Sequence, residues 1–158
     1  MLTSDYSGPQ PFSMCFPIRL SHTDPAGFVF FSRYFEMFQA LAEEWFENCL
    51  DTDFADMITN QRIGQPTVHT ECQFIKPCVL GDKLDLALIL EKMGKSSLSI
   101  RFIGSVDGEV RLRARSVQVI LSMEEGRAVA IDDRMRSRMQ TYIDHVEPPD
   151  EIGPEARA

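Results

Sequence analysis

The chain has 158 residues, a net charge of −8 at pH 7 and 44% hydrophobic residues, which fits one domain with a single sizeable core. The acidic balance argues against a nucleic-acid surface, which normally needs a basic stripe, and against binding to anionic lipid. No signal-peptide pattern and no run of eighteen apolar residues occurs, so we expect no membrane span and a cytoplasmic protein.

The cysteines and histidines show no pattern of a metal site. The four cysteines are irregularly spaced and include no Cys-x-x-Cys pair, which favours reduced, mostly buried thiols. The three histidines lie far apart and show no paired ligand spacing. We therefore expect no bound metal. The residues concerned are Cys15, Cys49, Cys72, Cys78, His22, His69 and His145.

The N-terminal part predicts a tail, a strand and a tight turn. Residues 1–13 are polar and rich in Gly and Pro, so we expect a flexible tail. The apolar run within residues 14–22 predicts a first strand, in which Pro17 is best tolerated at a sheet edge or a bulge. An Asp-Pro-Ala-Gly sequence follows, in which the proline biases Asp24 towards an extended backbone and Gly27 permits a geometry that side chains disfavour.

The longest predicted helix comes directly after this turn. A Phe-Val-Phe-Phe segment ends at Phe31, and Ser32 is the predicted N-cap. Over residues 33–50 the apolar side chains recur at spacings of three and four, while charged residues fall largely on the other side. This pattern predicts an amphipathic helix that buries one face.

The rest of the chain reads mainly as consecutive strands. Residues 51–62 predict a short helix or loop, and Asp107-Gly108 is the strongest hairpin signal. Asp132 and Asp133 can cap a final helix over residues 134–142, before a flexible tail over 144–158. Alternating apolar residues predict strands over 67–76, 83–93, 98–102, 109–123 and 127–131.

One antiparallel sheet that buries a face against one helix makes a two-layer α+β domain. Its opposite face also carries apolar side chains, too many to be left in water, so we expect self-association. These side chains are Ile75, Ala87, Ile89, Ile103 and Val119.

The Asp-Pro-Ala-Gly turn between a first strand and a long, aromatic-rich helix resembles the 4-hydroxybenzoyl-CoA thioesterase family. The resemblance extends in order of elements over roughly residues 16–142. It implies a hotdog fold for residues 14–143, an antiparallel sheet wrapped around one long central helix. It also implies hydrolysis of an acyl-CoA substrate, with no cofactor because coenzyme A is part of substrate and product. The family forms dimers with two sites at the interface, usually paired into a dimer of dimers.

The turn and the helix start suggest how a thioester carbonyl could be attacked. A helix N-terminus offers unpaired N–H groups and a positive dipole end, which can polarise a carbonyl. Asp24 lies just upstream, as nucleophile or as general base on a water molecule. By resemblance, Asp24 is the catalytic carboxylate and the backbone N–H of Phe31 polarises the carbonyl. The alternative for Asp24 is an ordinary turn residue that bonds nearby N–H groups; the order of the elements favours catalysis.

Residues around the turn are the predicted substrate contacts. His22 could orient substrate or water, although a polar residue at a strand end more often meets solvent. The aromatic side chains favour an aryl acyl group such as benzoyl or 4-hydroxybenzoyl, although the same rings could simply form core. The predicted contacts near the turn are Gly27, Phe28, Phe30, Phe31 and Tyr34.

Two predicted contacts come from further along the chain. His69, beside Glu71, could reach the site across a dimer interface, and a surface or interface pair is the alternative. Lys95 and Ser96 suit the phosphates of CoA and match a lysine that the family uses there, and a solvated turn is the alternative. Arginines at 111, 113 and 115 could add phosphate contacts, with salt bridges as the default interpretation.

Other functions remain open at this point. A short or medium aliphatic acyl-CoA is the alternative substrate. A hotdog dehydratase or hydratase would need a His-rich motif, which is absent after Asp24. A non-catalytic acyl-CoA-binding protein is the third possibility, and it would keep its function after substitution of Asp24.

Overall fold

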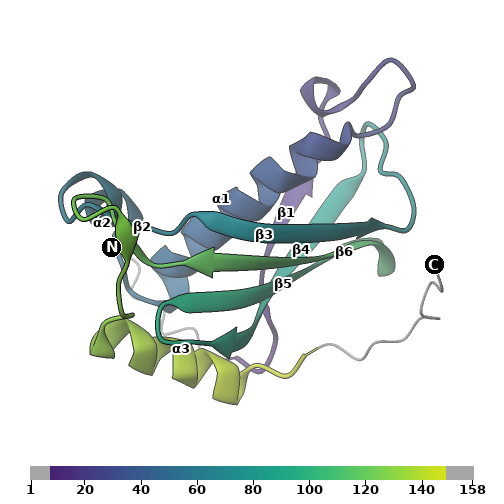
Figure 1. The fold of residues 1–158 in the computed structure, drawn as a ribbon. Helices are drawn as coiled ribbons and strands as arrows, with labels where there is room; N and C mark the ends of the chain where they lie inside the picture. The colour runs from purple at the N-terminus through teal and green to yellow at the C-terminus, as the bar shows by residue number, and fades with distance from the viewer. Residues whose placement is uncertain (1–7, 149–158) are drawn as a thin grey trace.

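A computed structural model describes residues 8–148 of the chain as one α+β domain (Figure 1). The first strand, β1 (Phe12–Pro17), begins two residues before the predicted start, and the last helix, α3 (Asp133–His145), ends three residues after the predicted end. Parts of the two predicted tails therefore belong to the folded domain, and residues 1–7 and 149–158 lie outside the described residues.

The main sheet has five antiparallel strands in the order β1-β4-β5-β6-β3. The strands are β3 (Thr67–Phe74), β4 (Lys83–Met93), β5 (Ser97–Val106) and β6 (Glu109–Val119), with β1 at the edge opposite β3. A small second sheet pairs β2 (Ile63–Gly64), β7 (Leu121–Ser122) and β8 (Arg127–Ala128). The short helix α2 (Phe54–Thr59) connects α1 to β2.

The long helix α1 (Phe31–Cys49) lies on one face of the sheet, as its apolar stripe predicts (Figure 1). It packs closest to β1 and β4, and Phe38 stacks on Phe102 of β5 with ring centroids 4.6 Å apart. It leaves β3 uncovered, since seven of the eight residues of that strand are exposed. Neither α1 nor any other helix within residues 8–148 is long and apolar enough to cross a membrane.

The hairpin prediction at Asp107-Gly108 is confirmed. Both residues have positive φ values, 50° and 79°, as a two-residue turn between twisted strands requires. The single long strand predicted over residues 109–123 is wrong in its second half. It breaks at Ile120, which is 3% exposed and whose amide donates to the carbonyl of Ser96 at 2.7 Å, so that β6 ends and β7 begins in a different sheet.

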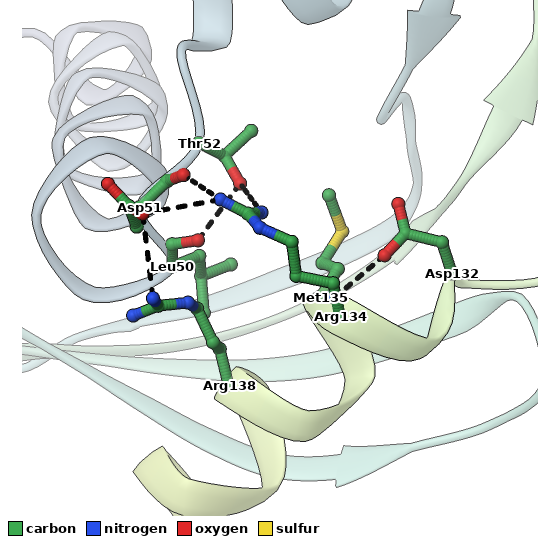
Figure 2. Close-up of polar contacts among 7 residues, drawn as sticks. All are labelled: Leu50, Asp51, Thr52, Asp132, Arg134, Met135 and Arg138. Carbon is green, nitrogen blue, oxygen red and sulfur yellow. Dashed lines mark hydrogen bonds and ion pairs between the residues drawn. The ribbon is translucent and has the colours of Figure 1, made fainter.

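Helix α3 closes the core at the C-terminal end of α1. The predicted cap is confirmed, because the Asp132 carboxylate accepts a hydrogen bond from the Met135 amide at 2.7 Å (Figure 2). Arg134 donates to the carbonyl of Asp51, and Arg134 and Arg138 each reach the Asp51 carboxylate at 3.5 Å (Figure 2). These contacts fasten α3 to the loop that follows α1.

Candidate active site

The segment between β1 and α1 folds into a small hairpin centred on Asp24. The Asp24 amide donates to the carbonyl of Phe28, and the Asp24 carbonyl accepts the Gly27 amide, both at 2.9 Å. Gly27 has a φ of 85°, the left-handed conformation that glycine adopts without strain. A further bond at 2.9 Å runs from the Phe30 amide to the His22 carbonyl. The hairpin therefore sets Asp24 opposite Phe28, and Phe28 lies three residues before the first residue of the helix.

The Asp24 carboxylate is half-buried and only partly used by the turn. Its Oδ1 accepts the Ala26 amide at 2.9 Å, the local bond expected of an Asp in a turn. Its Oδ2 has no hydrogen-bond partner among residues 8–148. Both interpretations of Asp24 are thus compatible with the geometry, since the turn bond leaves one carboxylate oxygen available for chemistry.

The start of α1 carries no side-chain cap. The helix begins at Phe31 with Phe30 in the N-cap position, so the prediction of Ser32 as N-cap is wrong. The amides of Phe31 and Ser32 have no acceptor within the described part of the chain, and the first turn contains no acidic side chain. Two N–H donors and the positive end of a 19-residue helix are therefore free to meet a ligand's carbonyl oxygen.

Apolar side chains surround this helix start. Phe28, Phe30 and Phe31 are between 43% and 56% exposed. A cavity of about 200 Å³ adjoins the helix start, lined by Phe31 and Tyr34 of the helix and by residues 74–77, which begin with the last residue of β3. Such a surface suits the apolar part of an acyl group.

Tyr34 differs from the other predicted aromatic contacts because it is buried, with 3% of its surface exposed. Its hydroxyl accepts the Cys78 amide at 3.4 Å, and its ring lies 5.7 Å from that of Phe74. Burial raises the pKa of Tyr34 far above its ordinary value, so the phenol stays protonated. Tyr34 therefore lines the cavity, while its hydroxyl is used within the protein.

The His22 side chain is used by local structure. Its Nδ1 accepts the Arg19 amide at 2.9 Å, which closes the short 3-10 helix η1 (Leu20–His22). This contact favours the structural interpretation of His22 over a role in orienting substrate or water.

The structure does not bring His69 to the helix start of the same protomer. Alternation along β3 turns Thr70, Cys72 and Phe74 towards the α1 side, so His69 lies on the opposite face of the sheet, paired with Val117. His69 therefore does not reach the helix start of its own protomer, and its contact across a dimer interface stays a prediction.

Lys95 and Ser96 are also remote from Asp24 within the protomer. They form the turn between β4 and β5, whereas the Asp24 hairpin adjoins the other end of β4, where the Ile18 amide donates to the Asp82 carbonyl. The 11 residues of β4 separate the two ends by roughly 33 Å. One protomer therefore cannot place Lys95 beside Asp24, and only another protomer can bring the two together.

Two of the three arginines of β6 form salt bridges, as the default interpretation expects. Arg111 pairs with Glu109 at 3.2 Å and Asp82 at 3.6 Å, and Arg115 pairs with Glu91 at 3.2 Å. These bonds use the charges within the protein and leave less of them for a phosphate.

A second cavity, also about 200 Å³, lies further along α1 and contains none of the predicted site residues. Its polar part comes from inward positions of β6 and β3, where serine, threonine and glutamine replace the leucines found on β4. The sequence signal for this cavity was the change from apolar to polar residues at the inward positions Ser116 and Gln118 of β6. The lining residues are Phe35, Phe38, Gln39, Thr67, Thr70, Phe102, Ser116 and Gln118.

Comparison with known proteins gives consistent matches. The model of the thioesterase-like superfamily matches residues 18–139. A 1,4-dihydroxy-2-naphthoyl-CoA hydrolase from Nostoc punctiforme is 30% identical over 135 residues, which cover 85% of this chain and 79% of the relative. The crystal structure of Slr0204, a 1,4-dihydroxy-2-naphthoyl-CoA thioesterase from Synechocystis, has a TM-score of 0.74 and 20% identity, covering 82% of this chain and 95% of that one. The BH1999 gentisyl-coenzyme A thioesterase also has a TM-score of 0.74 and 20% identity, covering 80% and 98%.

Proposed function

The chain belongs to the thioesterase-like superfamily and has its hotdog fold, and on that basis we propose that it hydrolyses an aromatic acyl-CoA to the free acid and coenzyme A. The observation that carries the proposal is the pairing of a carboxylate that has one uncommitted oxygen, Asp24, with the uncapped start of α1. An aryl-lined cavity adjoins that helix start. Together they supply a base or nucleophile, an oxyanion donor and an apolar acyl site.

In the proposed reaction, the thioester carbonyl oxygen accepts the Phe31 N–H, and negative charge develops on it as the carbonyl carbon is attacked. If Asp24 attacks directly, the C–S bond breaks, CoA leaves as a thiolate that takes up a proton, and water then cleaves the mixed anhydride. If Asp24 acts as general base, it takes a proton from the water that attacks. Both routes consume one water molecule and need no cofactor, since coenzyme A enters as part of the substrate.

The substrate proposed on the sequence alone, a benzoyl or 4-hydroxybenzoyl ester, is now broadened. The Nostoc relative acts on a dihydroxynaphthoyl ester, so we include acyl groups with two fused rings. The exposed rings of Phe28, Phe30 and Phe31 support an aryl group of either size, because aromatic pairs gain from edge and offset contacts beyond area burial.

A panel of esters tests this function. We expect thiol release from 1,4-dihydroxy-2-naphthoyl-CoA or 4-hydroxybenzoyl-CoA with a kcat/KM at least about tenfold above that for hexanoyl- and palmitoyl-CoA. A higher value for hexanoyl-CoA would replace the aryl substrate with the aliphatic alternative. Binding of the esters without cleavage of any would show a binding protein in place of an enzyme.

The free thiols are compatible with a reducing compartment, and we propose that the enzyme is cytoplasmic. All four cysteines are free. Burial raises the pKa of Cys49 to about 12 and that of Cys72 to about 11. Such thiols are protonated at neutral pH and therefore react slowly with oxidants and disulfides.

We also propose that the protein is a homodimer that pairs into a dimer of dimers. The outer edge of β3 supports this, because no strand within residues 8–148 pairs with it and Val68, Phe74 and Ile75 are between 43% and 61% exposed around it. A second protomer is also what the predicted contacts of His69 and Lys95 require.

Val68→Lys is expected to weaken this assembly, because it puts a charge on the strand edge where Val68 is 61% exposed. Light scattering should give a multiple of 18.0 kDa for the wild type and a shift towards 18.0 kDa for the variant. Gln140→Lys, on the exposed side of α3, is the matched control and should leave the mass unchanged. A wild-type mass of 18.0 kDa at all concentrations would contradict the proposed assembly.

A further inference from the structure

The two cavities beside α1 are each lined by residues of that helix and of β3. The first is lined by Phe31 and by Phe74, at the end of β3. The second is lined by Phe35 and Phe38 of the helix and by Thr70 of β3. At 1.5 Å per residue, Phe35 lies about 6 Å and Phe38 about 10 Å along α1 from Phe31. The second cavity therefore lies within about the length of a two-ring acyl group from the Phe31 amide.

A continuous series of ring contacts runs from the first cavity to the second. The ring centroids of Phe31 and Phe35 are 6.4 Å apart, and those of Phe35 and Phe38 are 5.5 Å apart. Phe38 then stacks on Phe102 of β5 at 4.6 Å. Phe31 lines the first cavity and Phe35, Phe38 and Phe102 line the second, so aromatic side chains border both cavities.

Thr70, Ser116 and Gln118 form a polar floor of the second cavity, and one hydrogen-bond acceptor of this floor has no partner among residues 8–148. Thr70 Oγ1 and Ser116 Oγ lie 2.9 Å apart across the β3–β6 pair. Gln118 follows on the same face of β6, with only 2% of its surface exposed. Its Oε1 is buried without a hydrogen-bond partner among residues 8–148. A buried acceptor of this kind destabilises the protein until a donor reaches it.

We infer that this polar floor selects acyl groups that carry a hydroxyl on the ring, with the Gln118 Oε1 as acceptor of the hydroxyl hydrogen. The inference rests on the proposed thioesterase function and deepens it, because it separates hydroxylated aryl esters from their unsubstituted counterparts. A ring without the hydroxyl leaves the Gln118 Oε1 unpaired and forgoes this hydrogen bond, so such esters react more slowly. Gln118 is therefore a specificity-determining residue that does not take part in bond breaking.

Gln118→Met, of similar length, removes the acceptor and tests the inference. We measure kcat/KM for 4-hydroxybenzoyl-CoA against benzoyl-CoA, and for 1,4-dihydroxy-2-naphthoyl-CoA against 2-naphthoyl-CoA. The wild type should prefer the hydroxylated member of a pair by at least about tenfold. The variant should lose most of that preference through slower turnover of the hydroxylated ester, with the unsubstituted ester cleaved as well as before or better.

The two proposals fail in different ways. An unchanged preference in an active Gln118→Met enzyme overturns the role of Gln118 and leaves the thioesterase function standing, and so does a wild type that cleaves both members equally. A wild type that cleaves no aryl ester overturns the function itself. If Gln118→Met does not fold, Thr70→Val removes a hydroxyl of the same floor at an exposed position of β3 and should reduce the preference in the same direction.

Discussion

Asp24→Asn is expected to lower kcat for the best aryl ester by at least about two orders of magnitude. The asparagine oxygen can still accept the Ala26 amide, the bond that Oδ1 makes at 2.9 Å, so the turn should persist. What is lost is the negative charge, and with it both the nucleophile and the general base. Steady-state thiol release measures the effect, and an unchanged thermal unfolding midpoint shows that the fold is intact.

Asp53→Asn is the matched control for this substitution. The Asp53 carboxylate also accepts a backbone amide, that of Asp56 at 2.9 Å, where it caps α2. We expect the Asp53→Asn protein to keep wild-type activity, because the same chemical change is made at a turn away from the helix start. Comparable activity of Asp24→Asn and wild type would make Asp24 a turn residue and remove the basis of the enzymatic mechanism.

Phe31→Pro is expected to have the second largest effect, a loss of about 10²–10³ in kcat. Proline lacks the N–H that is proposed to polarise the carbonyl, yet the first helical position is where a helix accepts it best. The residue before it must be extended, and Phe30 already is, with φ −68° and ψ 130°. The substitution therefore deletes one hydrogen-bond donor with little expected change in helix content, which circular dichroism checks.

Phe31→Ala separates the amide of this residue from its ring. It keeps the N–H and removes a side chain that is 56% exposed and lines the first cavity. We expect it to raise KM for aryl esters with a smaller loss in kcat than Phe31→Pro. Equal kcat values for the proline and alanine variants would show that the Phe31 amide does not stabilise the transition state.

The sequence predicted most of the fold because its signals were local. The stripe of α1, the alternation of β4 and β5 and the Asp107-Gly108 turn each depend on residues a few positions apart. The uncapped start of α1 was missed, since Ser32 is a good cap by type. The break at Ile120 was missed too, because its amide bonds to Ser96, a partner far away in sequence.

The candidate site was predictable only in its N-terminal part. Asp24 and Phe31 lie in one continuous segment, so a motif could indicate them together. His69 and Lys95 depend on strand faces and sheet ends, which the sequence does not place relative to the helix. Gln118 depends on the fold even more, since its importance lies in an unpaired buried oxygen beside α1 and becomes visible only when the sheet is assembled.

The docking of α3 also bears on how the chain is made. Tyr142 packs on Trp45 of α1 at 5.4 Å, and its hydroxyl accepts the amide of Phe12, 130 residues earlier. During translation the indole ring and the first strand emerge long before their last partner. Contacts between residues so far apart in sequence form late and slowly, so this part of the core stays exposed to solvent until α3 has left the ribosome. Burial of this part of the core is therefore complete only when α3 is available to pack against it.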